Sequence, residues 1–300
     1  MNIVFDSTCF CIDQWQQAFS EIGSTVTLLK PHSVSDDKVD VLLLWKPVRQ
    51  DWTNASGLKL VFFLGAGVDM SQGKVEFRPG VSVTHFKDAG MKRAMCDYVS
   101  YALMHYQRRF DHFQQCQQKC YWEQQRAYRT SESMRVTVLG LGSLGAVVAT
   151  HLAALGYQVC GWSRSAKQLD NVQCVYGGES LYSLLARTEV LVNMLPDTPK
   201  TRHLIGMDVL AALPQDAVVI SLSRGSVIDT QALLTLLDTH HLRGAFMDVF
   251  EQEPLMPNDP LWHHPKITIT PHQSAPTQAL DGAKEIVVAL QHMADNNVGR

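Results

Sequence analysis

The fold of this chain is decided by the stretch Arg135-Val136-Thr137-Val138-Leu139-Gly140-Leu141-Gly142-Ser143-Leu144-Gly145. Its first five residues read as a buried β-strand, which runs directly into a glycine-rich turn and then into a helix that should end near Gly156. A second strand follows at Gln158–Trp162. Strand, turn, helix and strand therefore stand in the order of a βαβ unit, whose two strands are parallel.

The three glycines of this turn have separate tasks in a dinucleotide-binding unit. Gly140 permits the tight turn, Gly142 lets the backbone approach a pyrophosphate, and Gly145 lets the helix pack closely on the strand. Backbone N–H groups at the start of the helix face the anion. We therefore expect a dinucleotide to bind through Gly140, Gly142, Ser143, Leu144 and Gly145.

The residues after the second strand indicate which dinucleotide is bound. An NAD site places Asp or Glu here, where the carboxylate accepts hydrogen bonds from the adenosine ribose hydroxyls. This chain has Ser163-Arg164-Ser165 instead, so no carboxylate repels a 2′-phosphate and Arg164 offers a fork of donors to one. We predict NADPH as the preferred cofactor, bound in part by Ser163, Arg164 and Ser165, with NADH as a weaker alternative. The competing interpretation is that Arg164 only caps the strand end in solvent.

Strand-like and helix-like segments alternate on both sides of this unit. After it, strands are predicted at 190–194, 217–222, 245–249 and 266–270. Before it, β-branched or apolar runs occur at 1–5, 24–29, 39–45, 58–64 and 81–85. Because parallel strands need a crossover connection, this repeated order predicts an α/β chain with a parallel sheet in each half.

Two domains are expected from the length of 300 residues. Apolar residues at helical spacing from Asp88 to Phe113 predict one long helix that crosses between them, which puts the boundary near residue 97. The amphipathic segment Thr277–Met293 should be a helix, and could return to cover the first domain. Segment 110–133 lacks a clear apolar stripe, so it is either a solvated arm or a surface completed by another subunit.

Composition excludes several classes of protein. The chain is 46% hydrophobic and 18% charged, which fits a globular protein with a sizeable core. A net charge of -3 offers no bulk attraction to phosphate polymers, so we expect no nucleic-acid partner. No apolar run approaches the roughly 18 residues of a spanning helix, and the N-terminus has no signal-peptide pattern. We therefore expect no membrane segment and a cytoplasmic protein.

The cysteines and histidines show no paired ligand spacing. Seven cysteines, an odd number, are scattered along the chain, which favours reduced thiols. The adjacent pairs His240-His241 and His263-His264 attract attention among the 12 histidines, but neighbouring side chains diverge on a helix or strand. We therefore expect no metal site.

Three chemically active side chains follow three different predicted strands. Arg224, Glu253 and His272 come after the strands at 217–222, 245–249 and 266–270. Because the ligand crevice of an open α/β sheet lies outside the carboxyl ends of its strands, the three should converge. Arginine would bind a substrate carboxylate and polarise the carbonyl, histidine would supply a proton to the carbonyl oxygen, and glutamate would favour and orient the imidazolium. Beside a nicotinamide, this set suits reduction of a 2-keto acid.

Several motifs resemble those of the D-2-hydroxyacid dehydrogenases. They are Gly140–Gly145, Asn193–Pro196 with Thr198 and Thr201, Ser223–Gly225, Asp248–Leu255 and Pro271-His272. Within that family the chain is most similar to the glyoxylate/hydroxypyruvate reductase A group, through Leu44–Pro47, Leu64–Asp69, Asp88–Met91, Arg108–Asp111, Gly161–Ser165 and Pro260–His263. The resemblance spans nearly the whole chain.

This resemblance implies a Rossmann-type nucleotide-binding domain inserted into a flavodoxin-like α/β substrate domain. The substrate domain would comprise residues 1–97 and the C-terminal helix 275–300, and the nucleotide-binding domain residues 98–274. The resemblance also implies a cleft that closes over the substrate, and a homodimer whose surface includes the arm after Phe110.

The resemblance also implies roles for individual residues. It makes Arg224, Glu253 and His272 the catalytic residues, and it adds Leu195, Pro196, Thr201 and Asp248 to the cofactor site. Leu195 and Pro196 would pack near the nicotinamide, and Asp248 would hydrogen-bond its amide. The backbone of Ala66 and Gly67 would hold the substrate carboxylate jointly with Arg224, unless this is a plain tight turn. Trp45 would form a wall of the substrate pocket, unless it is a core aromatic.

Together these features predict an NADPH-dependent reductase that converts glyoxylate to glycolate and hydroxypyruvate to D-glycerate. One alternative keeps the fold and the three catalytic residues but acts on a bulkier or phosphorylated 2-keto acid. Another is a nucleotide-sensing regulator on the same scaffold, with binding intact and turnover lost. Retention of Arg224, Glu253 and His272 argues against the regulator.

Overall fold

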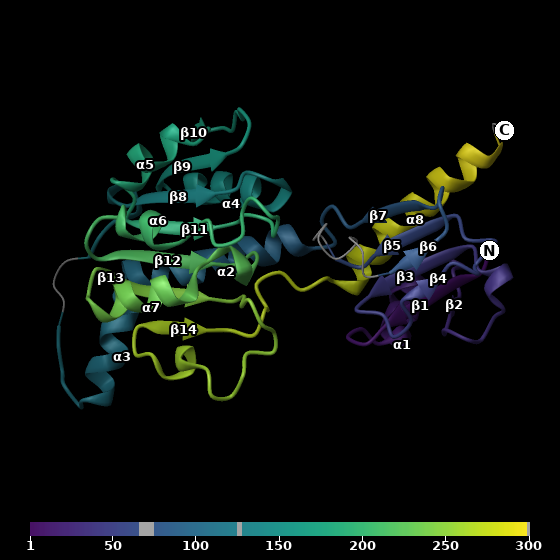
Figure 1. The fold of residues 1–300 in the computed structure, drawn as a ribbon, viewed down its shortest axis with the longest axis horizontal. Coiled ribbons are helices and arrows are strands. Elements are labelled where there is room, and N and C mark those ends of the chain that lie inside the picture. The colour runs from purple at the N-terminus through teal and green to yellow at the C-terminus, as the bar shows by residue number, and fades with distance from the viewer. Residues whose placement is uncertain (66–74, 125–127, 299–300) are drawn as a thin grey trace. The chain divides into compact units, whose positions relative to one another are not determined.

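The computed structural model describes residues 1–65, 75–124 and 128–298, and its elements are labelled in Figure 1. The chain divides into two compact units. The first comprises Met1–Met91 and Pro276–Arg300, and the second comprises Lys92–Ala275. The sequence analysis puts the first boundary near residue 97, inside the crossing helix. The division in the structure lies at the start of that helix, because five of its buried residues belong to the core of the second unit: Met95, Val99, Ala102, Leu103 and Tyr106.

The first unit is built on a five-stranded parallel sheet with the strand order β2-β1-β3-β5-β7. Its strands are β1 (Ile3–Ser7), β2 (Leu28–Leu29), β3 (Val41–Trp45), β5 (Leu60–Phe63) and β7 (Ser82–His85). A separate parallel pair is formed by β4 (Asp51–Trp52) and β6 (Glu76–Phe77). The order of the larger sheet reverses between β1 and β3, as in flavodoxin-like folds, which confirms the predicted fold class for this unit.

Helix α8 (Ala279–Val298) completes the first unit from the far end of the chain. It packs against α1 (Ile12–Glu21), and its residues Ala283 and Ile286 are fully buried. The carboxylate of Glu285 accepts hydrogen bonds from three consecutive backbone N–H groups, those of residues 87, 88 and 89, at 2.5–3.0 Å. Burial and this triple hydrogen bond together fix the helix to the segment that follows β7.

Two predicted elements differ from the structure. The strand predicted at 24–29 is reduced to β2, because backbone groups of that segment form hydrogen bonds with the side-chain amide of Gln16 instead of with a neighbouring strand. It donates to the carbonyl oxygen of Val26 and accepts from the N–H of Leu28, each at 2.8 Å. The single long helix predicted for 88–113 is wrong. Helices α2 (Met91–Gln107) and α3 (Phe110–Gln118) are separated at Arg109, whose φ of 59° is left-handed and cannot continue a helix.

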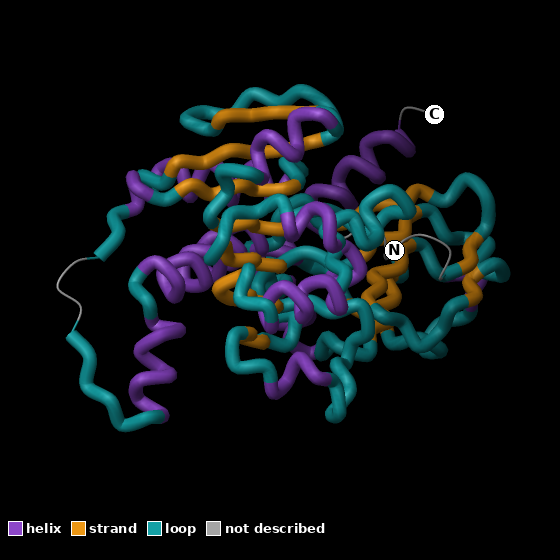
Figure 2. Tube along the Cα trace, turned by 60° about the vertical axis from the view of Figure 1, so that its left-hand side comes forward, coloured by secondary structure: helices purple, strands orange, loops and turns teal. Residues whose placement is uncertain are grey.

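The second unit contains a seven-stranded parallel sheet in the order β10-β9-β8-β11-β12-β13-β14. Strands are drawn in orange in Figure 2. Its strands are β8 (Arg135–Leu139), β9 (Gln158–Ser163), β10 (Gln173–Tyr176), β11 (Val190–Asn193), β12 (Ala217–Ser221), β13 (Leu242–Met247) and β14 (Ile267–Ile269). The order runs outward in both directions from β8, and reverses between β8 and β11. This is the Rossmann order extended by one strand, as predicted, and ligands of such sheets bind at the reversal.

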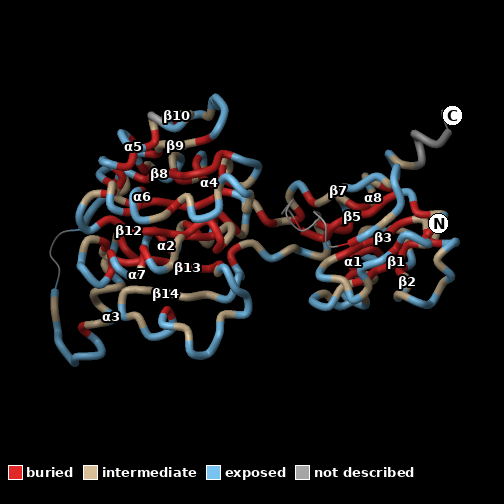
Figure 3. The backbone as a smooth tube through the Cα atoms, viewed as in Figure 1, coloured by how far each residue is buried: buried red, intermediate tan, exposed pale blue. Residues whose placement is uncertain are grey.

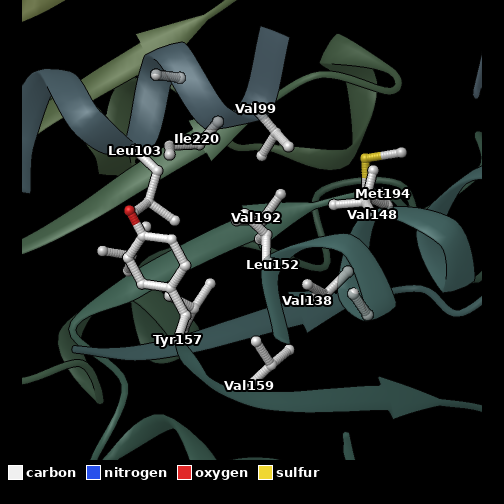
Figure 4. Packing of buried hydrophobic residues seen from close by; sticks show 14 of the residues in the cluster. Val99, Leu103, Val138, Val148, Leu152, Tyr157, Val159, Val192, Met194 and Ile220 are labelled. Atoms are coloured by element: carbon white, nitrogen blue, oxygen red, sulfur yellow. The ribbon is translucent and has the colours of Figure 1, made fainter. Parts of the chain in front are cut away.

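Helices cover both faces of this sheet. On one face, α2 and α4 (Ser143–Ala154) pack against Val138, Val192 and Ile220, as Figure 4 shows. The other face is covered by α5 (Glu179–Leu185), α6 (Met207–Ala211) and α7 (Thr230–Asp238). The strands are buried between exposed helix surfaces in Figure 3, as expected for a parallel sheet with helices on both sides. Among the described residues, no helix is long and apolar enough to cross a membrane.

Candidate active site

The glycine turn after β8 has the geometry that a dinucleotide requires. Gly140 has a φ of +100°, and a Cβ atom added to it would lie 2.7 Å from the carbonyl oxygen of Met194. A Cβ on Gly145 would collide with the carbonyl oxygen of Gly140, so only glycine lets α4 approach β8 this closely. A Cβ on Gly142 would meet no atom within 4 Å and would project into open space. Gly142 is the N-cap of α4 and places no side chain over the helix start, which leaves room for a pyrophosphate there.

The end of β9 carries the residues predicted to select the cofactor. Ser163 is the last residue of β9, the strand next to β8, and its buried Oγ donates to the carbonyl oxygen of Ser165 at 2.7 Å. This hydrogen bond turns the chain back after the strand and leaves Arg164 exposed. The end of β9 lies beside the glycine turn, because the N–H of Gly140 donates to the carbonyl oxygen of Trp162 at 2.8 Å. Contact between Arg164 and a 2′-phosphate remains a prediction.

A network of short hydrogen bonds shapes the loop after β11. Oγ1 of Thr201 donates to the carbonyl oxygen of Pro196 at 2.6 Å, and the hydroxyl of Ser223 donates to the carbonyl oxygen of Leu195 at 2.8 Å. The fully buried amide of Asn193 accepts from the N–H of Leu195 at 3.1 Å and donates to Ser221 in β12. Sequence reasoning gave Asn193 no role, although an amide that ends the otherwise apolar strand β11 is the signal that could have found it.

Asp248, directly after β13, is fully buried, and its side-chain carboxylate accepts four hydrogen bonds. The donors to its carboxylate are the hydroxyls of Tyr98 (3.2 Å) and Thr270 (2.7 Å) and the N–H groups of Gln273 (2.8 Å) and Ser274 (2.9 Å). Its carbonyl oxygen also accepts from the N–H of His272 at 2.8 Å. Asp248 therefore fixes the segment around His272. A hydrogen bond between Asp248 and the nicotinamide amide remains a prediction. The amide would be a further donor to a carboxylate that already accepts four hydrogen bonds.

His272 and Glu253 form a close pair. Nδ1 of His272 lies 2.8 Å from Oε2 of Glu253, and the other carboxylate oxygen accepts from the N–H of Phe250 at 3.1 Å. His272 has a φ of 55°, a left-handed conformation that is uncommon for residues other than glycine, although His adopts it more often than most. The imidazole is 45% exposed, so a small molecule could reach its other nitrogen, Nε2.

Arg224 follows β12 and lies on a loop that packs against the Glu253 segment. Its Nη1 donates to the carbonyl oxygen of Ser223 at 2.7 Å. A Cβ on the next residue, Gly225, would collide with the backbone of Phe250, so this glycine lets the two loops touch. Ser274 donates to the carbonyl oxygen of Leu222 at 3.3 Å, which ties the His272 segment to the same strand end. The predicted arginine, glutamate and histidine thus come from the carboxyl ends of three neighbouring strands, β12, β13 and β14.

The predicted substrate residues lie in the first unit. Trp45 ends β3, and its ring stacks on Phe10 with centroids 6.2 Å apart. A Cβ on Gly65 would collide with that ring, so the indole packs directly on the backbone after β5. Ala66 and Gly67 lie outside the described residues. The roles of these three residues in substrate binding remain predictions.

Comparison with known proteins settles the family. Residues 99–274 match the sequence profile described as the NAD binding domain of D-isomer specific 2-hydroxyacid dehydrogenases. The chain belongs to this family. Its members are oxidoreductases, which confirms the predicted enzyme class, and the matched residues span the glycine turn as well as Arg224, Glu253 and His272.

Relatives in the family extend over the whole chain. The glyoxylate/hydroxypyruvate reductases A of Photorhabdus laumondii and Salmonella paratyphi B are each 34% identical over 299 residues, which covers 97% of this chain and 95% of theirs. A family member from Xanthobacter autotrophicus, solved with NADPH and MES, superimposes with a TM-score of 0.91 at 34% identity, covering 98% of this chain and 95% of that one. The NADPH-dependent glyoxylate/hydroxypyruvate reductase of Sinorhizobium meliloti, solved with NADP and sulfate, has a TM-score of 0.86 at 27% identity, covering 100% and 96%.

Proposed function

We propose that this chain reduces glyoxylate to glycolate and hydroxypyruvate to D-glycerate with NADPH. The observation that carries the proposal is the 2.8 Å contact between His272 and Glu253. Both residues follow strands of the same sheet whose strand β8 leads into the glycine turn. Relatives that are 34% identical over nearly the whole chain are glyoxylate/hydroxypyruvate reductases A. NADPH, when bound, supplies the hydride that is added to the carbonyl carbon.

His272 supplies the proton in this proposal. Its Nδ1 faces Glu253, so Nε2 is the nitrogen that passes a proton to the carbonyl oxygen, which becomes the hydroxyl of the product. The Glu253 carboxylate fixes the orientation of the ring through its contact with Nδ1. Arg224 binds the carboxylate of the 2-keto acid with its guanidinium fork and polarises the neighbouring carbonyl. These roles account for the three polar side chains that follow the carboxyl ends of β12, β13 and β14.

The preference for NADPH follows from the end of β9. Arg164 is exposed there, and the residue before it is a serine, so no carboxylate stands between a 2′-phosphate and the guanidinium. The solved relatives from Xanthobacter autotrophicus and Sinorhizobium meliloti contain NADPH or NADP, which supports the same choice.

Steady-state oxidation of NADPH tests the proposal. Purified protein is assayed with glyoxylate and with hydroxypyruvate, and each assay is repeated with NADH. We expect turnover with both acids, and a higher kcat/KM for NADPH than for NADH. Turnover only with a bulkier or phosphorylated 2-keto acid would replace the substrate assignment. Tight NADPH binding without turnover on any 2-keto acid would favour a nucleotide-sensing regulator instead.

We also propose that the protein is a homodimer in the reducing cytoplasm. The helices and arm of segment 101–128 expose several large apolar side chains, which are Tyr101, Met104, Phe110, Tyr121, Trp122 and Tyr128. A second copy of the chain would cover them. All seven cysteines are free, which is typical of a reducing compartment. Light scattering coupled to size exclusion tests the dimer: a monomer at micromolar concentration would contradict it.

A further inference from the structure

Three potential metal ligands gather at α3 and the segment that follows it, outside the site described above. His112 and Cys116 are four residues apart on this helix and therefore share one of its faces. Glu123 lies beyond the helix end, where the N–H groups of Cys120 and Tyr121 donate to carbonyl oxygens of residues 117 and 116 and turn the chain back. One ligand atom from each of His112, Cys116 and Glu123 lies within 4.8 Å of the other two.

Two of the three separations between ligand atoms are close to those of a tetrahedral zinc site. Nε2 of His112 lies 3.4 Å from Sγ of Cys116 and 2.9 Å from Oε2 of Glu123. Zinc binds such atoms at about 2.0–2.3 Å, so tetrahedral geometry separates neighbouring ligand atoms by about 3.4–3.6 Å. Both observed separations are within about 0.5 Å of these values.

Nε2 of His112 cannot donate a hydrogen bond to Glu123 and accept one from Cys116 at the same time. Both contacts run to one atom, Nε2 of His112. If this nitrogen carries a proton, it donates to Glu123 and has no lone pair to accept from the thiol of Cys116. If it carries none, it can accept from the thiol, but its lone pair then faces the carboxylate oxygen. A divalent cation removes this conflict, because it takes a lone pair from the nitrogen, the sulfur and the oxygen alike.

Burial and charge suit a borderline-soft cation. Cys116 is buried, whereas the side chains of His112 and Glu123 are each 31% exposed, so an ion can reach the cluster from solvent and retain a water ligand. One thiolate and one carboxylate balance the charge of a divalent ion beside a neutral imidazole. Magnesium and calcium prefer sites made of oxygen atoms, whereas a mixed sulfur, nitrogen and oxygen set is typical of zinc.

We propose that His112, Cys116 and Glu123 bind one zinc ion, with water as the fourth ligand. The ion fixes the segment 119–124 to α3, since two ligands come from the helix and one from the returning chain. The sequence analysis expects no metal because it finds no paired spacing among the cysteines, and because the side chains of adjacent histidines diverge. The ligands found here are four and seven residues apart, and they meet only because the chain reverses after the helix. This site is independent of the proposed reductase activity.

Zinc binding is measured on the full chain without a histidine tag, after treatment with a chelator. The protein competes with a zinc-binding dye, and the bound metal is counted by mass spectrometry. We expect one zinc ion per chain. Cys116→Ser should weaken binding at least about 100-fold, because loss of even an outer-shell partner costs 10–100-fold. The matched control is Cys120→Ser, which removes an exposed cysteine outside the cluster and should leave the affinity unchanged.

Cobalt reports on the ligands directly. With Co²⁺ in place of zinc, wild-type protein and Cys120→Ser should show a thiolate-to-metal charge-transfer band, and Cys116→Ser should lack it. Glu123→Gln should keep the band but bind zinc more weakly, and it retains the buried thiol should Cys116→Ser fail to fold. The proposal is overturned if wild type binds no stoichiometric zinc, if Cys116→Ser and Cys120→Ser bind zinc equally, or if Glu123→Gln binds it as tightly as wild type.

Discussion

His272 is the single residue on which the proposed reduction depends most. Its Nδ1 is engaged by Glu253, which leaves Nε2 to serve the substrate. We expect His272→Ala to lower kcat by about 10²–10⁴-fold, the loss typical of a missing general acid. The Kd for NADPH should change little, because the glycine turn after β8 is untouched. Steady-state kinetics and a fluorescence titration with NADPH measure the two quantities.

An exposed histidine of the same unit is the matched control for this substitution. His263 lies in the 3-10 helix Pro260–His263 and has no place in the proposed site, so His263→Ala should keep the wild-type kcat. A His272→Ala variant with wild-type kcat would assign the proton to another group.

At the scale of elements, the turn that joins β8 to α4 contains one glycine expected to matter for NADPH binding and another expected to matter for the stability of the fold. A Cβ on Gly142 meets no atom of the protein, whereas one on Gly145 collides with Gly140. We expect Gly142→Ala to keep the wild-type free energy of unfolding but to weaken NADPH binding at least about tenfold, or about 1.4 kcal/mol. Gly145→Ala should lower the free energy of unfolding by about 1–3 kcal/mol. Urea unfolding and NADPH titration of both variants check this; unchanged NADPH affinity in a folded Gly142→Ala would place the pyrophosphate elsewhere.

The hydrogen bond from Tyr98 to Asp248 joins α2 to the end of β13 and makes stability depend on pH. Burial, aided by the Asp248 carboxylate, raises the pKa of Tyr98 from 10.0 to about 12. Between these values an unfolded tyrosine loses its proton while the folded one keeps it, so the contribution of Tyr98 is full below about pH 10 and is lost as the pH approaches 12. Tyr98→Phe should therefore cost about 0.5–1.5 kcal/mol at neutral pH, and less above pH 10.

Urea unfolding from neutral pH to pH 12 measures this difference. Tyr176→Phe, at an exposed tyrosine of β10, is the control and should match wild type throughout. A stability gap between wild type and Tyr98→Phe that stays constant up to pH 12 would show that the phenol does not titrate in the way its burial requires.

Local sequence was sufficient for some elements and insufficient for others, for physical reasons. The turn after β8 was predictable because its glycine spacing, between a strand and a helix, is itself the pattern of a dinucleotide-binding turn. The strand at 24–29 was overestimated because Gln16, on another element, takes its backbone partners. The break at Arg109 was missed because apolar spacing continues across it. The four donors to Asp248 come from α2 and from the segment beyond β14, so no pattern around residue 248 indicates them.

At the scale of the whole molecule, three apolar clusters of the described residues each lie within one unit. Apolar clusters on the two faces of the seven-stranded sheet draw only on residues between 95 and 275. A further cluster around Leu42 and Val61 draws only on the first unit. Each sheet is thus stabilised mainly within its own unit, and a ligand of one unit need not stabilise the other.

Hydrogen exchange with and without NADPH tests this independence. The glycine turn, Arg164 and the loop after β11 all belong to the second unit, so the nucleotide should stabilise that unit against unfolding. At about 100 times the Kd, mass action adds about 2.7 kcal/mol to the stability of the form that binds. We expect protection of the slowest amides in β8 and β11 to rise by about this amount, while those in β1 and β3 change little. An equal rise in both sheets would mean that the two units unfold together, and a rise confined to β1 and β3 would move the nucleotide site to the first unit.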